Sequence, residues 1–169
     1  MLHFDGIYSA AFVWVNGKYV GYTQGSNNDA EFDLTNVVRE GENNVSVQVI
    51  RWSDGSYLEG QDMWHMSGIH RDVYLMAVPK TYIRDHYITA NLKPLSYNSG
   101  SMQVDFLVAN PQGEKYSKTI KATLIGPDGQ EVASQQTNVA ATGTEEAQAS
   151  VTFEGLSNPQ LWSAETPTL

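Results

Sequence analysis

The chain has 169 residues, no cysteine, and 19 acidic against 10 basic side chains, which gives a formal net charge of −9. This charge opposes binding to phosphate backbones and anionic lipid surfaces, so nucleic acid and membrane partners are not expected. Without cysteine there are no disulfides or thiolate metal sites, and without a signal-peptide pattern or a membrane-length apolar run we expect a soluble protein of the cytoplasm or the periplasm.

The first half of the chain predicts short strands joined by turns. In residues 9–21, SAAFVWVNGKYVG, the dipeptide Asn16-Gly17 separates two β-rich runs and predicts a tight hairpin, with Trp14 and Tyr19 in the core. Alternating polar and apolar residues predict further strands at 31–35, 44–51 and 72–78. Pro79 removes a backbone donor, so a first domain is expected to end at residue 79.

The second half, residues 80–169, has the regular spacing of strands and turns that is typical of a small β-sandwich. Strands are predicted at 82–92, 101–109, 118–125 and 144–153, with a weaker candidate at 131–136. Turn sequences such as NPQG and GPDG separate them. No amphipathic helix is expected anywhere, and the sequence therefore predicts an all-β protein of two domains.

Residues 51–72, RWSDGSYLEGQDMWHMSGIHRD, are expected to carry the binding chemistry. Neither a period of two nor one of 3.6 persists across them, which predicts a long ordered loop between strands. The loop combines carboxylates, tryptophans and a tyrosine. Aromatic rings stack on the apolar faces of sugars and carboxylates accept bonds from sugar hydroxyls, so the composition favours sugar or cation binding.

Each acidic residue of this loop also has a plainer interpretation. Asp62 could bind a sugar hydroxyl or a hard cation, but spacing alone favours local capping of a backbone N–H by roughly two to one. The pair Asp54-Gly55 is interpreted first as a tight turn. Glu59 could act with Asp62 as acid and base, yet their spacing fixes no distance, so no catalysis is assigned. His65 and His70 lack a third ligand and are interpreted as ordinary polar residues.

Two stretches of the first half carry a resemblance to a known family: VWVNGKYVGYTQGSNNDAEFDLT and NNVSVQVIRWSDGSYLEGQDMWHMSGIHRDVYL. They resemble the N-terminal sugar-binding domain of β-galactosidases of glycoside hydrolase family two, most closely in RWSDGSYLE, QDMW, MSGI and RDV. Residues 80–169, with NPQLWSAE near the end, resemble the domain that follows. The resemblance implies a partial jelly-roll (galactose-binding-like) sandwich over 1–79, then an immunoglobulin-like β-sandwich over 80–169 that lacks its last strand.

The resemblance also implies a role for the chain. The family hydrolyses terminal β-D-galactosides with retention, through a covalent glycosyl-enzyme on one glutamate while a second acts as acid and then base. Both glutamates belong to a barrel that this chain ends before. We therefore expect a non-catalytic N-terminal region, inactive alone, that contributes a substrate- and cation-binding loop and a spacer. The alternatives are a free-standing carbohydrate-binding module and a structural or interaction domain.

Site residues follow from the same resemblance. The aspartate of QDMW contacts galactose and a cation, usually sodium, in this family, so Asp62 becomes a candidate substrate and sodium ligand that the barrel completes. Gln24 and Asp54 match positions that help to hold a structural magnesium, together with an N-terminal segment that this chain lacks. Neither ion is expected to bind tightly to the chain alone. The missing early strands leave sheet edges open, which predicts a homo-oligomer.

Overall fold

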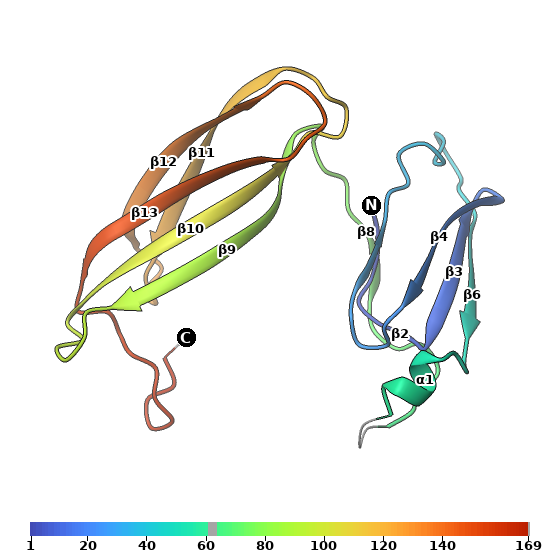
Figure 1. Ribbon diagram of the computed structural model, residues 1–169, viewed down its shortest axis with the longest axis horizontal. Helices are drawn as coiled ribbons and strands as arrows, with labels where there is room; N and C mark the ends of the chain where they lie inside the picture. Colours follow the sequence, from blue (N-terminus) through green and yellow to red (C-terminus); the bar gives the residue numbers. More distant parts are fainter. Residues whose placement is uncertain (61–63, 169) are drawn as a thin grey trace. The chain divides into compact units, whose positions relative to one another are not determined.

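The computed structural model describes residues 1–60 and 64–168 of the chain. The chain folds into two compact units, Met1–Val78 and Pro79–Leu169 (Figure 1). In the described residues, regular structure consists of strands and one four-residue helix, which confirms the all-β prediction. None of the helical structure described reaches the length and apolar character that crossing a membrane requires.

The first unit consists of short antiparallel strands in three sheets, with the orders β5-β1-β8, β2-β7 and β4-β3-β6. Its elements are β1 (Leu2–Phe4), β2 (Ile7–Tyr8), β3 (Ala10–Val15), β4 (Lys18–Gln24), β5 (Ala30–Phe32), β6 (Val45–Ile50), α1 (Gly55–Leu58), β7 (Gly68–Ile69) and β8 (Val73–Leu75). Figure 1 shows β3, β4 and β6 side by side, with α1 at one end of this sheet.

The core of the first unit draws side chains from both three-stranded sheets. Phe4 of β1 and Phe32 of β5 meet edge to face, with ring centroids 6.0 Å apart. They pack in one cluster with Val13 and Val15 of β3, which are fully buried. Because alternate residues of a strand point to opposite faces, each of these strands also presents a second set of side chains away from this core.

The hairpin between β3 and β4 turns at Asn16 and Gly17, whose φ angles of 52° and 76° are both positive, as a type I′ turn requires. The prediction that Tyr19 lies in the core is wrong, because this side chain is 57% exposed. Trp14 is only half-buried. Both belong to an aromatic group with Phe12, at centroid distances of 5.9–6.4 Å. Their strand positions alternate with those of the buried valines.

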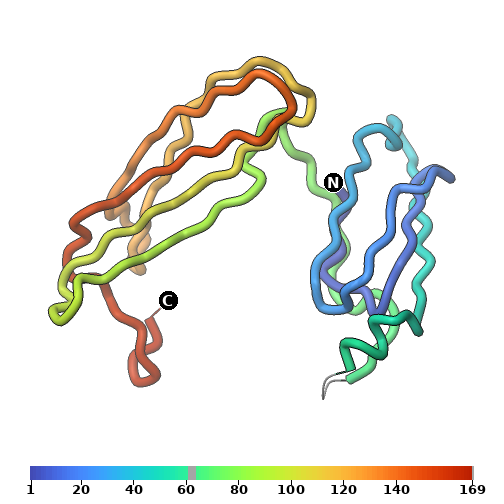
Figure 2. Tube along the Cα trace, viewed as in Figure 1, coloured from blue at the N-terminus to red at the C-terminus, as the bar shows by residue number. Residues whose placement is uncertain are grey.

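The second unit is a β-sandwich of one three-stranded and one two-stranded sheet, with the orders β13-β10-β9 and β11-β12. Its strands are β9 (Tyr82–Leu92), β10 (Ser99–Ala109), β11 (Tyr116–Ile125), β12 (Glu131–Ala141) and β13 (Ala147–Ser157). The two layers can be followed in Figure 2. Phe106 and Phe153 from one sheet pack in the same buried cluster as Ile120 and Val139 from the other.

Strand β12 is much longer than the weak candidate at 131–136. It pairs with β11 along its whole length, from Ile125 opposite Glu131 to Tyr116 opposite Ala141. The polar sequence QQTNVAA gives little strand signal by itself, because β-propensity mainly reflects a fit to a partly buried, paired surface. The neighbouring strand supplies the hydrogen-bond partners that keep these residues extended.

Residues 51–72 contain two regular elements where an irregular loop was expected. The one-turn helix α1 begins after Asp54, whose carboxylate accepts a hydrogen bond from the Gly55 N–H at 3.0 Å. Asp54-Gly55 forms the expected tight turn, in which the Ser56 N–H donates to the Ser53 carbonyl oxygen at 3.1 Å, and this turn leads directly into the helix. An aspartate before a helix satisfies one of its free N–H groups. Strand β7 forms by pairing with β2, with Ile69 opposite Ile7. Two-residue strands depend on such a partner and leave no periodic pattern in the sequence.

Candidate functional site

A pocket of about 300 Å³ lies beside the segment 51–72 in the first unit. Its walls come from β2, from the turn after β4, from the residue that ends α1, and from the chain that leads to and follows β7. The lining residues are Tyr8, Ser26, Asn27, Glu59, Trp64, His65, Met66, His70 and Arg71. Residues far apart in sequence thus meet around the predicted binding loop.

Glu59 holds the part of this loop that directly follows α1. Its Oε2 atom accepts hydrogen bonds from Ser26 Oγ at 3.0 Å and from Ser26 N at 3.4 Å. Ser26 is only 2% exposed. In a protein without Glu59, the Ser26 N–H and O–H groups would therefore be buried without this acceptor. Sequence analysis gave Glu59 no role, because its partner lies 33 positions away. We infer a positioning role and no direct chemistry.

Arg71 attaches the C-terminal end of the same loop to two turns. Its Nη1 atom donates to the backbone oxygen of Asn27 at 3.0 Å and to that of Asp5 at 3.3 Å. Asn27 directly follows Ser26, the residue that donates hydrogen bonds to Glu59. Glu59 and Arg71 therefore attach two points of the loop to the turn that follows β4, and Arg71 is a second positioning residue that the sequence did not reveal.

The structure brings Gln24 and Asp54 together from β4 and the start of α1. The Gln24 side-chain amide donates to Asp54 Oδ1, and its oxygen accepts from the Tyr22 hydroxyl at 2.7 Å. Carboxylate and amide oxygens are ligands of the kind that magnesium takes. In this arrangement, however, the amide nitrogen faces Asp54, so binding magnesium through both side chains requires the amide group to turn over.

The two loop histidines do not form a joint ligand set: His65 has a hydrogen-bond partner, whereas His70 Nδ1 is buried without one among the described residues. His65 Nδ1 lies 2.5 Å from the Tyr8 hydroxyl, with the two rings edge to face at 5.9 Å. The His70 ring packs against Gly6, where an added Cβ would lie 2.9 Å from it. Neither histidine belongs to the metal-ligand group found among the described residues. The interpretation of both as ordinary polar residues stays a prediction.

Asp62 lies outside the described residues. The described part of the same segment exposes several aromatic side chains: Trp52 at 58%, Tyr57 at 77% and Trp64 at 91%. The guanidinium of Arg51 lies 5.0 Å from the centroid of the Trp52 ring, within the range of a cation–π contact. Exposed rings next to an acidic loop are the combination that sequence analysis associated with sugar binding.

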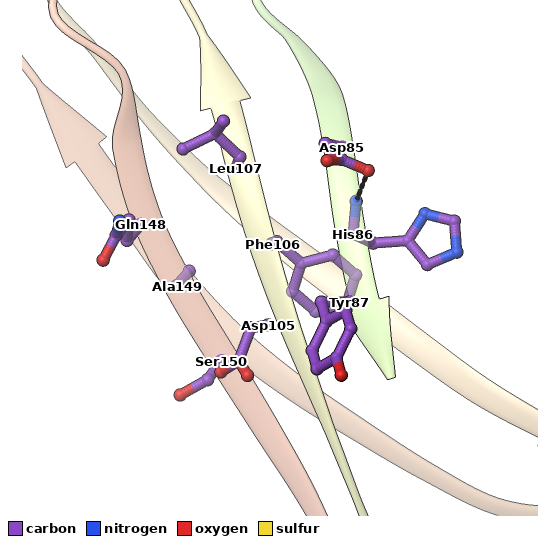
Figure 3. Close-up of a pocket in the computed structure, with 9 residues that line it drawn as sticks. All are labelled: Asp85, His86, Tyr87, Asp105, Phe106, Leu107, Gln148, Ala149 and Ser150. Carbon is purple, nitrogen blue, oxygen red and sulfur yellow. Dashed lines mark hydrogen bonds between the residues drawn. The ribbon is translucent and has the colours of Figure 1, made fainter. Parts of the chain in front are cut away.

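A second depression, of about 410 Å³, lies on the sheet β13-β10-β9 of the second unit (Figure 3). Its lining residues are Asp85, His86, Tyr87, Asp105, Phe106, Leu107, Gln148, Ala149 and Ser150. They form three adjacent register rows, such as Tyr87, Asp105 and Ser150. The walls are thus neighbouring strands of one sheet, and no sequence-predicted site residue lies among them.

Comparison with known proteins identifies two matching families. Residues 1–79 match the family described as "Glycosyl hydrolases family 2, sugar binding domain", and residues 81–169 match "Glycosyl hydrolases family 2". The chain is 40% identical to a β-galactosidase of Priestia megaterium over 172 residues, covering 99% of this chain and 16% of that protein. It is also 40% identical to a β-galactosidase of Yersinia enterocolitica, covering 98% and 17% respectively. The chain thus spans about one sixth of these relatives.

Solved structures show the same fold. A β-glucuronidase of Bacteroides uniformis superimposes with a TM-score of 0.87 at 24% identity, over 98% of this chain and 20% of that one. A putative β-galactosidase of Bacteroides fragilis gives a TM-score of 0.84 at 24% identity, over 98% and 26%. Together with the family matches, these superpositions confirm the jelly-roll part and the immunoglobulin-like sandwich expected from the sequence.

Replacing Glu59 by alanine tests the anchoring of the loop. Glu59→Ala leaves the buried Ser26 donors without their acceptor, and we expect a loss of about 1–3 kcal/mol in the free energy of unfolding. Urea unfolding followed by tryptophan fluorescence measures it. Glu42→Ala, at an exposed site, is the control and should be nearly neutral. Equal effects of the two substitutions would show that Glu59 does not anchor the loop.

Proposed function

Because the chain belongs to glycosyl hydrolase family 2, we propose that it is the N-terminal, non-catalytic region of a retaining β-galactosidase. The observation that carries this proposal is the 40% identity to β-galactosidases along the whole chain. In this proposal residues 1–79 form the sugar-binding domain. Residues 80–169 form the spacer that leads to a catalytic barrel.

The segment 51–72 would form part of the wall of the galactoside pocket. Asp62 would accept a hydrogen bond from a galactose hydroxyl and provide one oxygen ligand to sodium, whose other ligands would come from the barrel. The Glu59–Ser26 and Arg71–Asn27 hydrogen bonds support this role, because they hold the segment in place on the two sides of Asp62 in sequence. The exposed ring of Trp64 adds an apolar surface close to Asp62 in sequence.

Magnesium is a second proposed ion, held in part by Gln24 and Asp54. Both side chains have oxygen atoms and already lie in hydrogen-bond contact, which supports a shared ligand role after the Gln24 amide turns over. Such an ion would stabilise the junction between β4 and α1. It would thereby hold the start of the segment 51–72, at a distance from the reacting bond.

Hydrolysis with retention requires two carboxyl groups about 5–5.5 Å apart across the glycosidic bond. In this proposal the barrel supplies both, while this chain binds and orients the sugar. The chain alone should therefore not hydrolyse a galactoside above background. Orientation still affects the rate, because contacts that hold the sugar where the carboxylates act lower the activation barrier.

A chimaera tests the proposal. This chain replaces the aligned segment of the Priestia megaterium β-galactosidase, and hydrolysis of nitrophenyl β-galactoside is measured with and without Asp62→Ala. Hydrogen bonds to charged groups contribute about 1.5–3 kcal/mol, so we expect the substitution to lower kcat/KM by about 10- to 150-fold. It should also reduce the difference in activity between sodium and choline chloride.

Two controls accompany the chimaera. Glu42→Ala in the same chimaera should keep its kcat/KM, and the isolated chain should give only background hydrolysis. Activity in the isolated chain would overturn the proposed division of labour between this region and a barrel. An active chimaera whose rate does not respond to Asp62→Ala would remove Asp62 from the galactose site.

A free-standing carbohydrate-binding module is the second candidate, and the exposed rings of Trp52, Tyr57 and Trp64 favour it. The two candidates differ in the affinity of the isolated chain. A pocket wall without its barrel offers few contacts, so we expect galactose to bind with a Kd weaker than about 1 mM. Tryptophan fluorescence measures this affinity. Micromolar binding that Trp64→Ala abolishes would establish the module instead.

Self-association through sheet edges also remains a prediction. Strands β5 and β8 lie at the two sides of β1, and strands β9 and β13 at the two sides of β10, so each of these sheets has outer strands that could pair with another chain. Size-exclusion chromatography with light scattering should show dimers or larger species as the concentration rises. A monomer mass at every concentration would contradict it.

A further inference from the structure

A second set of polar side chains lies on the sheet β5-β1-β8. His3, in the central strand, stands opposite Glu31 of β5 and opposite Tyr74 of β8. Directly paired residues of an antiparallel sheet point to the same face, so these three side chains form one row. The neighbours of His3 in β1, Leu2 and Phe4, belong to the core on the other face.

Asp29, just before β5, joins this row. A nitrogen of His3 and one carboxylate oxygen from each of Asp29 and Glu31 all lie within 4.8 Å of one another. Tetrahedral ligands about 2.0–2.2 Å from one ion lie about 3.3–3.6 Å apart, so a metal ion would draw the three atoms together by up to about 1.5 Å. The exposed Asp29 side chain can make this adjustment.

The state of His3 points to a ligand. The residue is only 6% exposed, and its Nε2 atom is buried without a hydrogen-bond partner among the described residues. Glu31 Oε1 lies 3.1 Å from Nε2, but this contact does not have hydrogen-bond geometry. A buried nitrogen that makes no hydrogen bond lowers the stability of the fold, and here the nitrogen also lies beside two carboxylates. A cation between the nitrogen and the carboxylates would restore that stability.

Tyr74 completes the surroundings of His3. The two rings stack with centroids 4.8 Å apart and planes 10° apart, and the Tyr74 hydroxyl lies 3.3 Å from His3 Nδ1. A proton on Nδ1 directed at this hydroxyl leaves the lone pair of Nε2 for a metal, which is the usual division of roles in a metal-bound histidine. Burial raises the pKa of Tyr74, and the carboxylates of Asp5, Asp29 and Glu31 raise it further, in keeping with local negative charge.

We propose that His3, Asp29 and Glu31 bind one divalent transition-metal ion. One imidazole and two carboxylates make a mixed nitrogen and oxygen set that suits zinc and its neighbours, whereas calcium and magnesium take oxygen ligands. The three ligands do not include Asp62, Gln24 or Asp54, and the proposal does not depend on the galactosidase proposal. The ion would link β1 to the turn before β5 and stabilise the first unit.

Zinc titration of the metal-free chain by calorimetry tests the site. We expect one zinc ion per chain, and at least about a 100-fold loss of affinity in Asp29→Asn or His3→Gln, because loss of a mere outer-shell partner already costs 10- to 100-fold. His86→Gln, at an exposed histidine of the second unit, is the control and should bind as the unaltered chain does. Zinc should also raise the Tm of the unaltered chain but not that of Asp29→Asn.

Asp29 is exposed, so Asp29→Asn is expected to fold even if the substitution of buried His3 prevents folding. Cobalt in place of zinc should give a visible absorption band that Asp29→Asn removes. Three results would overturn the proposal. They are the absence of one-to-one zinc binding, equal affinity in the unaltered chain and Asp29→Asn, and a loss of affinity in His86→Gln as large as in Asp29→Asn.

Discussion

Much of the first unit depends on the position of the three-residue strand β1 between β5 and β8. Because side chains alternate between the two faces along β1, Leu2 and Phe4 lie in the core and His3 lies on the opposite face. Phe4 packs against Phe32 of β5, so the pairing that builds the core also sets Glu31 beside His3. A shift of one residue in this register would exchange the two faces and destroy both arrangements. Core and candidate metal ligands thus share one structural cause.

The segment 51–72, which we propose to bind the sugar, is held by polar contacts of Glu59 and Arg71 and is not part of a large sheet. Glu59 and Arg71 bind neighbouring residues of the turn after β4, Ser26 and Asn27. Charged groups make stronger hydrogen bonds than neutral ones, so two such contacts can fix a segment that carries few buried side chains. A loop held in this way can present the exposed Trp64 side chain to solvent or to a further domain.

The second unit has a different construction. Its five strands are ten or eleven residues long and enclose an apolar cluster between two sheets. No sequence-predicted site residue lies in it, and its larger depression is the surface of a sheet. The division of roles within family 2 that we propose, a sugar-binding unit followed by a spacer, agrees with this contrast.

The sequence by itself determined the strand-rich class, the hairpin at Asn16-Gly17 and the family, because turn chemistry, alternation and motifs such as QDMW are local. Helix α1, strand β7 and the length of β12 required the tertiary structure, since each is stabilised by a cap or a partner strand. The same holds for the site. The segment 51–72 is recognisable in sequence, but the contacts of Glu59, and the meeting of His3 with Asp29 and Glu31, join residues 26 to 33 positions apart. Only the tertiary fold brings such residues close together.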